Sequence, residues 1–206
     1  MRAVVLTDHN GPASLVVRDA PEPVCGPDDV LVEITATALN RADLLQTRGF
    51  YPDPFPGPTE IPGMECSGIV ATVGSRVRDV AVGDAVMAIT SGGAYAERIA
   101  IHHRQVMQVP AVVGVADAAA IPEVFITAWD ALVVQGGLTS GRWALVHAGA
   151  SGVGTAAIQI VKALGGRVAV TCSAGKVEAC RTLGADLVID YASTDFVDAV
   201  STPCST

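Results

Sequence analysis

The chain has 206 residues, of which half are hydrophobic and only 4% are aromatic. Its 13 basic and 21 acidic residues give a net charge of −8, with no basic stripe, which argues against nucleic acid as the main partner. The five scattered cysteines contain no CxxC pair, which argues against a disulfide framework and favours a cytoplasmic protein. Residues 1–8 meet a charge too early for the apolar core of a signal peptide. No run approaches the roughly 18 apolar residues of a transmembrane helix, so no membrane partner is expected.

The first 115 residues are typical of a domain built from short strands. Residues 30–36 alternate apolar and polar side chains, which predicts a half-buried strand. Gly-Asp and Gly-Gly pairs separate further short apolar runs, so strands are also expected at 68–73, 85–90 and 95–101. Many short strands between turns favour a barrel or a sandwich. The proline-rich segment 51–63 predicts an extended surface loop.

Between residues 116 and 200 the pattern changes to alternating helices and strands. The apolar, helix-like segment 116–135 contains Pro122, which should start or kink a helix. The continuous apolar run 143–148 predicts a fully buried strand. Helices are then expected at 152–164 and 175–183, and strands at 168–172 and 187–189. Strand–helix–strand–helix–strand predicts a parallel sheet with right-handed crossovers.

A turn of small residues, His147 to Gly154, joins the first of these strands to its helix. Such a turn lets the backbone approach a pyrophosphate, and the helix N-terminus presents unpaired N–H groups and a positive dipole end. The glycine pattern is imperfect, because Ser151 takes the middle position of GxGxxG. The strand before it and the amphipathic helix after it nevertheless favour a dinucleotide site. The alternative is a tight turn that only packs the helix on the sheet.

The end of the second parallel strand predicts which dinucleotide is bound. An acid at this place would hold the ribose of NAD, and the segment 171–176 contains none. Ser173 can donate a hydrogen bond and Lys176 supplies a positive charge, which together suit the 2′-phosphate of NADPH. The alternative is that Ser173 caps the following helix and Lys176 is solvated. We therefore expect NADPH as the cofactor.

Four segments together resemble a known family: 38–43, Tyr51 with its proline loop, 63–68 and 147–154. They resemble the zinc-independent quinone oxidoreductases of the medium-chain dehydrogenase/reductase family, p53-inducible quinone oxidoreductase type. The resemblance implies a mixed α/β protein with a GroES-like β-barrel substrate domain over 1–115. It also implies the first half of a Rossmann (parallel βαβαβ) domain over 116–200, with the active site in the cleft between the two.

The resemblance also implies which residues form the site. Asn40 and Tyr51 would be the catalytic residues of the quinone pocket, and Thr127 would lie at the nicotinamide. The other expected cofactor-binding residues are Gly149, Ser151, Gly152, Val153 and Gly154 at the pyrophosphate, Ser173 and Lys176 at the 2′-phosphate, and Tyr191 near the adenine. Alternatives stay open: Asn40 could cap the short helix 41–46, Tyr51 could pack against prolines, and Thr127 could bond back to its own helical turn.

No metal is expected. The zinc ligands of the related alcohol dehydrogenases fall at Asn40 and Met64, and an amide and a thioether do not make a zinc site. His102 and His103 are adjacent and would point to opposite sides of a strand, so they form a poor metal pair.

The expected function is NADPH-dependent reduction of a quinone, with an enone or enal reductase as the nearest alternative. The Asn40 amide, the Tyr51 hydroxyl or water would meet negative charge on the substrate oxygen, while Asp43 and Glu65 hold loops in place. We see no obligatory general acid.

The resemblance implies a C-terminally truncated chain, because only three of the six Rossmann strands precede Tyr191 and residues 201–206 form a divergent tail. Three explanations stay open: a reductase completed by a partner chain or by further sequence, a non-catalytic NADPH-binding protein, or a truncated remnant. The expected partner is a small quinone or conjugated carbonyl, and full-length relatives are expected to be homo-oligomers.

Overall fold

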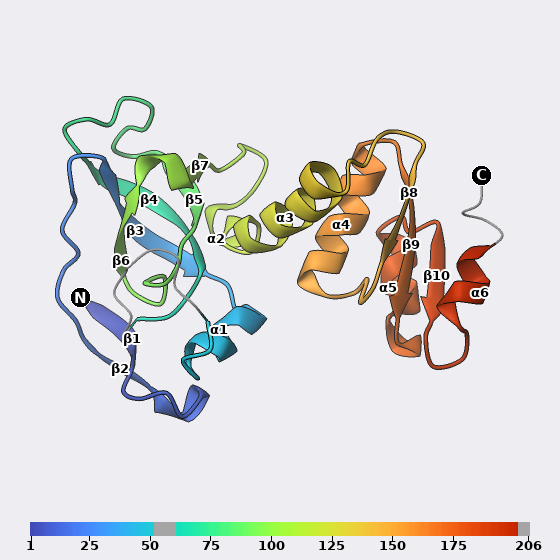
Figure 1. The fold of residues 1–206 in the computed structure, drawn as a ribbon. Helices are drawn as coiled ribbons and strands as arrows, with labels where there is room; N and C mark the ends of the chain where they lie inside the picture. Colours follow the sequence, from blue (N-terminus) through green and yellow to red (C-terminus); the bar gives the residue numbers. More distant parts are fainter. Residues whose placement is uncertain (52–60, 202–206) are drawn as a thin grey trace. The chain divides into compact units, whose positions relative to one another are not determined.

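The computed structural model describes residues 1–51 and 61–201. It divides into two compact units, Met1–Glu123 and Val124–Thr206 (Figure 1). Most of the predicted proline-rich loop, and the tail apart from Ser201, lie outside the described residues.

The first unit is built from antiparallel strands. Five of them form one sheet in the order β6-β3-β4-β5-β7, and the two N-terminal strands pair with each other. Their bounds are β1 Arg2–Leu6, β2 Leu15–Asp19, β3 Asp29–Thr37, β4 Glu65–Val73, β5 Ala85–Ile89, β6 Arg98–His102 and β7 Val106–Gln108. The prediction of many short strands is confirmed.

Strand β3 lies inside this sheet and shows the predicted alternation. Val30 and Val32 are fully buried, while Glu33 is exposed. Gly68 of β4 pairs with β3 at a register shift, and a Cβ there would overlap the Glu33 carbonyl oxygen. Glycine is therefore required at this register shift, where a side chain would overlap the backbone of β3.

The strand predicted over 95–101 starts later than expected, at Arg98. The backbone before it pairs elsewhere: the Tyr95 N–H donates to the Pro62 carbonyl at 2.9 Å, and Ala96 forms an isolated bridge with Ala3 of β1. The prediction was therefore wrong by three residues, because tertiary pairing removes the first residues of the apolar run from the sheet.

Short helices connect these strands. They are η1 Pro12–Ser14, α1 Arg41–Gln46, η2 His103–Gln105 and α2 Val115–Ala118. The short helix considered over 41–46 is thus present with those bounds. Helix α3, Pro122–Trp129, begins at the proline predicted to start or kink a helix and continues into the second unit.

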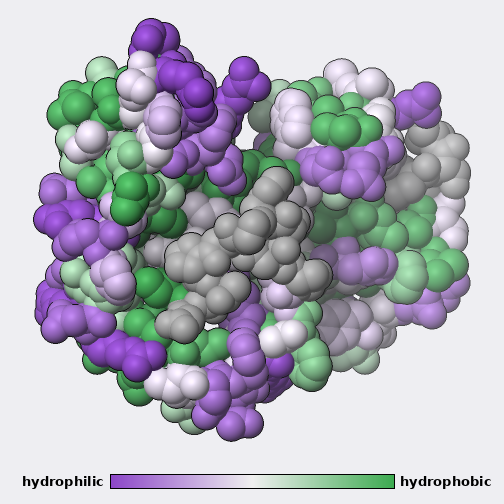
Figure 2. Space-filling view, turned by 60° about the vertical axis from the view of Figure 1, so that its left-hand side comes forward, coloured by the Kyte–Doolittle hydropathy of each residue, from purple (hydrophilic) through white to green (hydrophobic). Residues whose placement is uncertain are grey.

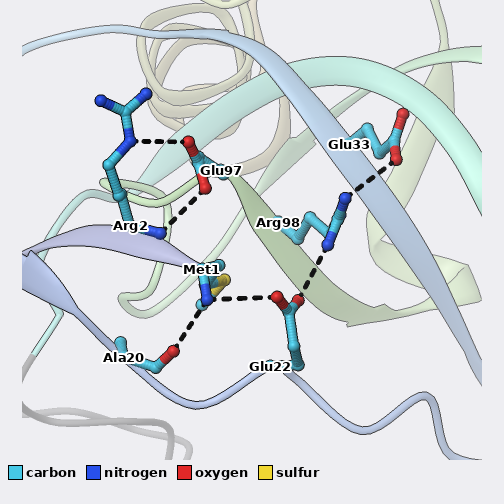
Figure 3. Close-up of polar contacts among 7 residues, drawn as sticks. All are labelled: Met1, Arg2, Ala20, Glu22, Glu33, Glu97 and Arg98. Carbon is cyan, nitrogen blue, oxygen red and sulfur yellow. Dashed lines mark hydrogen bonds and ion pairs between the residues drawn. The ribbon is translucent and has the colours of Figure 1, made fainter.

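Ion pairs tie the N-terminus to the sheet of the first unit (Figure 3). The Met1 ammonium lies 3.1 Å from Glu22 and donates to the Ala20 carbonyl at 2.9 Å. Arg98 of β6 bonds Glu22 at 3.1 Å and lies 3.5 Å from Glu33 of β3. Most of these side chains are substantially exposed, so solvent weakens each pair and the network orients the chain more than it stabilises the unit.

The second unit contains a parallel three-stranded sheet in the order β10-β9-β8 (Figure 1). Helices follow the strands, which confirms the predicted βαβαβ order. The bounds are π-helix η3 Asp130–Gln135, β8 Trp143–Val146, α4 Gly152–Ala163, β9 Arg167–Cys172, η4 Ala174–Lys176, α5 Val177–Thr182, β10 Leu187–Asp190 and α6 Phe196–Ser201.

One prediction for this unit was wrong: β8 is not fully buried, and it ends at Val146. Leu145 is 41% exposed, whereas five of the six residues of the middle strand β9 are buried. Within the described residues β8 pairs only with β9, so it is an edge strand with one open side. The apolar sequence of β8 predicts fuller burial than this strand has in the structure.

Helix α4 is buried on two sides. The predicted stripe packs as expected through Ala156, Ala157 and Ile160, which join Ala128 of α3 in one apolar cluster. Ile158 and Val161 are fully buried in a second cluster against β9. The predicted amphipathic stripe was therefore incomplete.

The surface carries hydrophobic residues among hydrophilic ones (Figure 2). Leu39 and Val17 of the first unit, for example, are 86% and 70% exposed. Among the described residues no helix is long and apolar enough to span a bilayer.

The burial of Ile158 predicts a stability effect confined to the second unit. Because its side chain is fully buried, Ile158→Ala should lower the unfolding free energy by about 2–5 kcal/mol. Both tryptophans, Trp129 and Trp143, lie in this unit, so tryptophan fluorescence in urea measures it. Val134→Ala, at a 67% exposed position, is the control and should change stability by less than about 0.5 kcal/mol. Equal effects of the two variants would contradict the packing described.

Candidate functional site

The first turn of α4 leaves N–H groups available for an anion. Ser151 is the N-cap, and its hydroxyl accepts a hydrogen bond from the Gly154 N–H at 3.1 Å. The first i→i−4 bond runs from the Thr155 N–H to the Ser151 carbonyl at 2.8 Å. The N–H groups of Gly152 and Val153 precede that bond and therefore lack an acceptor within the helix. In a helix of 12 residues, these groups and the positive dipole end favour a bound phosphate.

Two glycines bring this loop close to the sheet. A Cβ on Gly149 would lie 2.5 Å from Cβ of Val170 in β9, and one on Gly154 would overlap the Ala148 carbonyl. Ala148 itself has φ 54° and is the one non-glycine with positive φ in the described part of the chain. Its carbonyl accepts the Ser151 N–H at 2.8 Å, which closes the turn. Side chains are thus excluded at positions 149 and 154, where the backbone packs directly against the sheet and the turn.

The other predicted cofactor residues follow the neighbouring parallel strands, whose carboxyl ends meet at the same edge of the sheet. Ser173 and Lys176 come after β9, and Tyr191, 62% exposed, comes after β10. Backbone bonds align the strand ends: Gly149 N–H to Thr171 carbonyl at 2.9 Å, and Tyr191 N–H to Cys172 carbonyl at 3.2 Å. The structure therefore gathers the predicted pyrophosphate, 2′-phosphate and adenine residues at one edge.

The alternative interpretation holds for Lys176, which is solvated, but not for the Ser173 side chain, which does not cap the helix. Ser173 precedes η4, but its hydroxyl makes no capping bond; the Lys176 N–H donates to the Ser173 backbone carbonyl at 2.9 Å instead. The Lys176 side chain is exposed and forms no ion pair within the described residues. Hydroxyl and ammonium are both available to a ligand.

His147, at the end of β8, was quoted in the sequence motif without a role. Its Nδ1 lies 3.1 Å from the Thr171 hydroxyl, and its ring meets Phe196 of α6 edge to face at 4.9 Å. Thr127 lies exposed on α3, and its hydroxyl makes no bond back to its own turn within the described residues.

In the first unit, Asn40 has a structural role. It is the N-cap of α1: its N–H donates to the Asp43 carboxylate at 2.6 Å, and its carbonyl accepts the Asp43 N–H at 3.1 Å. The capping alternative is therefore confirmed, because Asn40 and Asp43 form a capping box at the start of α1. The side-chain Nδ2 donates to Oε1 of Glu65 at 2.7 Å.

Two buried carboxylates organise this region. Glu65, 1% exposed, accepts the Asn40 amide on Oε1 and the Glu123 N–H on Oε2 at 2.9 Å, within the first turn of α3. Asp43, 6% exposed, also accepts the Tyr95 hydroxyl at 2.6 Å, and its Oδ1 has no hydrogen-bond partner among the described residues. Sequence reasoning expected both acids to hold loops in place but did not find their partners.

No ion pair joins Asp43, Glu65 or Glu123 to a cation within the described residues. Burial, with the charges of Glu65 and Asp43, raises the pKa of Glu123. Burial and the hydrogen bond to Asp43 raise the pKa of Tyr95. Burial and the Glu65 charge raise the pKa of Cys66 to about 12, so this thiol is neutral and unsuited to act as a nucleophile.

Two shallow apolar grooves adjoin Asn40 and Tyr95. One, of about 470 Å³, is lined by Pro12, Leu15, Leu39, Asn40, Arg41, Asp43, Leu44, Thr47 and Tyr95. The second, of about 500 Å³, shares Leu15, Leu39 and Tyr95 with it. Tyr51, predicted as a catalytic partner of Asn40, is half-buried after α1 and lines neither groove. The structure thus places an amide, but not Tyr51, in an apolar groove.

The donor set at the expected zinc position does not fit that metal. Met64 is 4% exposed, and the Asn40 amide is bonded to Glu65. Residues 1–51 and 61–201 contain no group of three or more His, Cys, Asp or Glu side chains that could hold a metal ion. No step of the mechanism is therefore assigned to zinc.

Two family models match the chain. One, described as alcohol dehydrogenase GroES-like domain, covers residues 26–111, and the other, zinc-binding dehydrogenase, covers 152–205. The first match covers β3 to β7 of the first unit, and the second begins at α4. Fold and site therefore define a GroES-like β domain joined to a partial Rossmann sheet, as in the NAD(P)H-binding oxidoreductases.

Individual proteins support the same assignment. The chain is 36% identical over 203 residues to the human synaptic vesicle membrane protein VAT-1 homolog, covering 97% of this chain and 51% of that protein. It is 39% identical to the tomato (Solanum lycopersicum) 2-methylene-furan-3-one reductase over 83% of this chain and 47% of that protein. The Escherichia coli quinone oxidoreductase, solved with NADPH, superposes with a TM-score of 0.86 at 29% identity, over 97% of this chain and 61% of that one.

The chain belongs to the medium-chain dehydrogenase/reductase superfamily of oxidoreductases. It spans about half the length of the curated relatives it matches.

The positive φ of Ala148 predicts that this residue is strained. Ala148→Gly should stabilise the second unit by about 0.5–1 kcal/mol, because glycine adopts this conformation without the Cβ clash. Ala150→Gly is the matched control: it removes the same methyl group at an ordinary φ and should destabilise by about 0.5–1 kcal/mol. Tryptophan fluorescence in urea measures both, and destabilisation by both variants would show that Ala148 is unstrained.

The raised pKa of Glu123 predicts a pH-dependent stability. Since folding favours the protonated carboxyl, its contribution is fully present below the ordinary value of 4.5 and is lost as pH rises through the folded-state pKa. Thermal denaturation followed by circular dichroism between about pH 4 and 8 should therefore show Glu123→Gln gaining stability relative to the unmodified chain as pH rises. Glu178→Gln, at an exposed helix position, is the control. A parallel pH profile for Glu123→Gln and the unmodified chain would contradict this.

Proposed function

We propose that the chain forms the substrate-binding unit and the phosphate-binding half of the cofactor unit of an NADPH-dependent oxidoreductase that reduces a quinone without zinc. The observation that carries the proposal is the edge of the second unit, where free N–H groups of α4 lie beside a strand end with a hydroxyl and an unpaired lysine and without a carboxylate. The similarity to the E. coli quinone oxidoreductase supports the choice of cofactor and substrate.

NADPH, when bound, supplies the hydride. The N–H groups of Gly152 and Val153 bind the pyrophosphate, with Gly149, Ser151 and Gly154 shaping the loop. Ser173 donates to the 2′-phosphate and Lys176 neutralises it. Thr127 contacts the nicotinamide, and Tyr191 lies near the adenine.

At the substrate, Asn40 provides an amide in the apolar groove, and Tyr51, which lines neither groove, is proposed as the second polar group. A quinone that is being reduced gains negative charge on oxygen, and a fixed amide N–H or a phenol hydroxyl stabilises that charge. The neutral Cys66 thiol and the hydrogen-bonded acids offer no nucleophile, so the protein positions the reactants and stabilises charge while the cofactor carries the redox chemistry.

An enone reductase is the second candidate. It is favoured by the 39% identity to the tomato 2-methylene-furan-3-one reductase. Hydride addition to a conjugated carbonyl also places negative charge on one oxygen, so the same amide would serve it.

Turnover of NADPH by the purified chain tests the function. We expect oxidation of NADPH with 1,4-benzoquinone or 9,10-phenanthrenequinone, and less with NADH. Oxidation only with a conjugated enone would select the second candidate. Tight NADPH binding without turnover of either substrate class would make this chain a cofactor-binding protein and overturn the proposed activity.

Lys176 should determine the preference for NADPH over NADH. Lys176→Met should weaken NADPH binding by about 10-fold to 100-fold, the range for a lost charge-assisted contact, and leave NADH binding nearly unchanged. Lys162→Met, at the other lysine of the chain, removes the same charge where it pairs with Asp186. It is the control and should affect both cofactors equally. Equal losses for NADPH and NADH in Lys176→Met would contradict a 2′-phosphate contact.

A further inference from the structure

We propose that Glu65 is a positioning residue for substrate reduction. Its buried carboxylate fixes the orientation of the Asn40 amide, and with it the position of the N–H that is left for the substrate. This inference rests on the proposed function, since it assigns Asn40 to the substrate. It names a residue that touches neither substrate nor cofactor and acts only through Asn40.

The first argument is the chemistry of the contact. The Asn40 side chain meets Oε1 of Glu65 at 2.7 Å. An ionised carboxylate only accepts hydrogen bonds, so the amide nitrogen has to face Glu65, which takes one of its two N–H groups and leaves the other for a ligand. The orientation of the Asn40 amide is therefore set by its partner. Asn40 also lines the apolar groove of about 470 Å³, and one of its amide N–H groups is not used by Glu65.

The second argument is that Glu65 cannot turn away. Its other oxygen accepts the Glu123 N–H at 2.9 Å, and the side chain is 1% exposed. The Asn40 backbone is held separately by Asp43 at 2.6 Å. Backbone and side chain of Asn40 are thus fixed by two acids from different elements, α1 and β4.

The third argument is that two donors meet at Glu65 and only a double acceptor satisfies both. Burying a carboxylate with no cation in ion-pair distance among the described residues is costly, and a neutral glutamine of similar size would cost less. Glutamine has one acceptor and one donor, however. Its oxygen would take the Glu123 N–H, which belongs to the backbone and cannot turn, and its NH₂ would then face Asn40. The Asn40 amide would have to flip, which moves its free N–H away from the place that it occupies beside Glu65.

A purely structural role makes a different prediction, and a double variant separates the two. In Asn40→Asp/Glu65→Gln the new NH₂ group meets a carboxylate, so the buried hydrogen bond and the net charge are both retained. Stability should recover. Position 40 would then carry only acceptors, which cannot stabilise negative charge on a substrate oxygen.

The experiment compares the unmodified chain, Glu65→Gln, the double variant and Glu33→Gln, the last removing an exposed carboxylate of the same unit. Thermal midpoint, NADPH affinity, and kcat and KM for 1,4-benzoquinone are measured. Glu65→Gln should keep its NADPH affinity and lose about 10-fold to 1,000-fold in kcat, the range for a misplaced oxyanion donor. The double variant should regain the thermal midpoint but not kcat, and Glu33→Gln should keep kcat. Unchanged kcat in Glu65→Gln, or recovery of kcat with stability in the double variant, would overturn the proposal.

A spectroscopic measurement keeps this test separate from the proposed function. In the unmodified chain the Asn40 side-chain NH₂ should give two well-separated ¹H–¹⁵N signals with one slowly exchanging proton, and Glu65→Gln should abolish that pattern. If the unmodified chain turns over no quinone but shows this signature, the proposed activity fails and the orientation by Glu65 stands. Two equivalent, fast-exchanging protons would overturn the orientation whatever the activity, including where Glu65→Gln does not fold.

Discussion

The close approach of the glycine loop to the central strand β9 determines what the second unit can bind. Gly149 lies where a Cβ would be 2.5 Å from Val170, and Gly154 lies against the Ala148 carbonyl. Ser151 then satisfies one N–H of the first turn and leaves two without an intrahelical acceptor. The same turn therefore both packs the helix against the sheet and leaves the N–H groups that an anion could bind. A side chain at either glycine would push the helix end away and remove the site with it.

The first unit depends on hydrogen bonds to buried acids rather than on acid–base chemistry. Glu65 and Asp43 accept bonds from Asn40, Glu123 and Tyr95, which lie on separate segments of the chain. Such a network fixes positions, because each acceptor is surrounded and little water reaches it. Under the proposed function, this network holds a substrate in place and stabilises its charge. It suits a reaction in which a dinucleotide carries the electrons.

Local periodicity was enough to predict most of the fold. The alternation at 30–36, the helix considered at 41–46 and the strand–helix order after Trp143 each follow from side chains within one element. Predictions of burial failed where the burial of a residue depends on which other elements pack against it. Strand β8 has the composition of an inner strand but pairs on one side within the described residues, and Ile158 and Val161 of α4 are buried off the predicted stripe.

Site residues could likewise be predicted when they lie within one stretch of sequence, but not when they meet only in the fold. The loop of Gly149 to Gly154 could be predicted because its chemistry and its turn occupy one stretch of sequence. The Asn40–Glu65 bond joins residues 25 apart on different elements, and the Glu65–Glu123 bond spans 58, so no local pattern contains them. One signal was present: Asn40 followed three residues later by Asp43 has the spacing of a capping box, which predicts that the two residues bond each other.

The central claim is that the carboxyl edge of the parallel sheet binds NADPH through α4 and the β9 end. Titration of the ¹⁵N-labelled chain with NADPH and then NADH, followed by ¹H–¹⁵N spectra, tests it most directly. The account predicts that NADPH shifts the amides of residues 149–154 and 173–176 and that NADH shifts only the first group. Shifts elsewhere with neither group affected, in a folded chain, would contradict it.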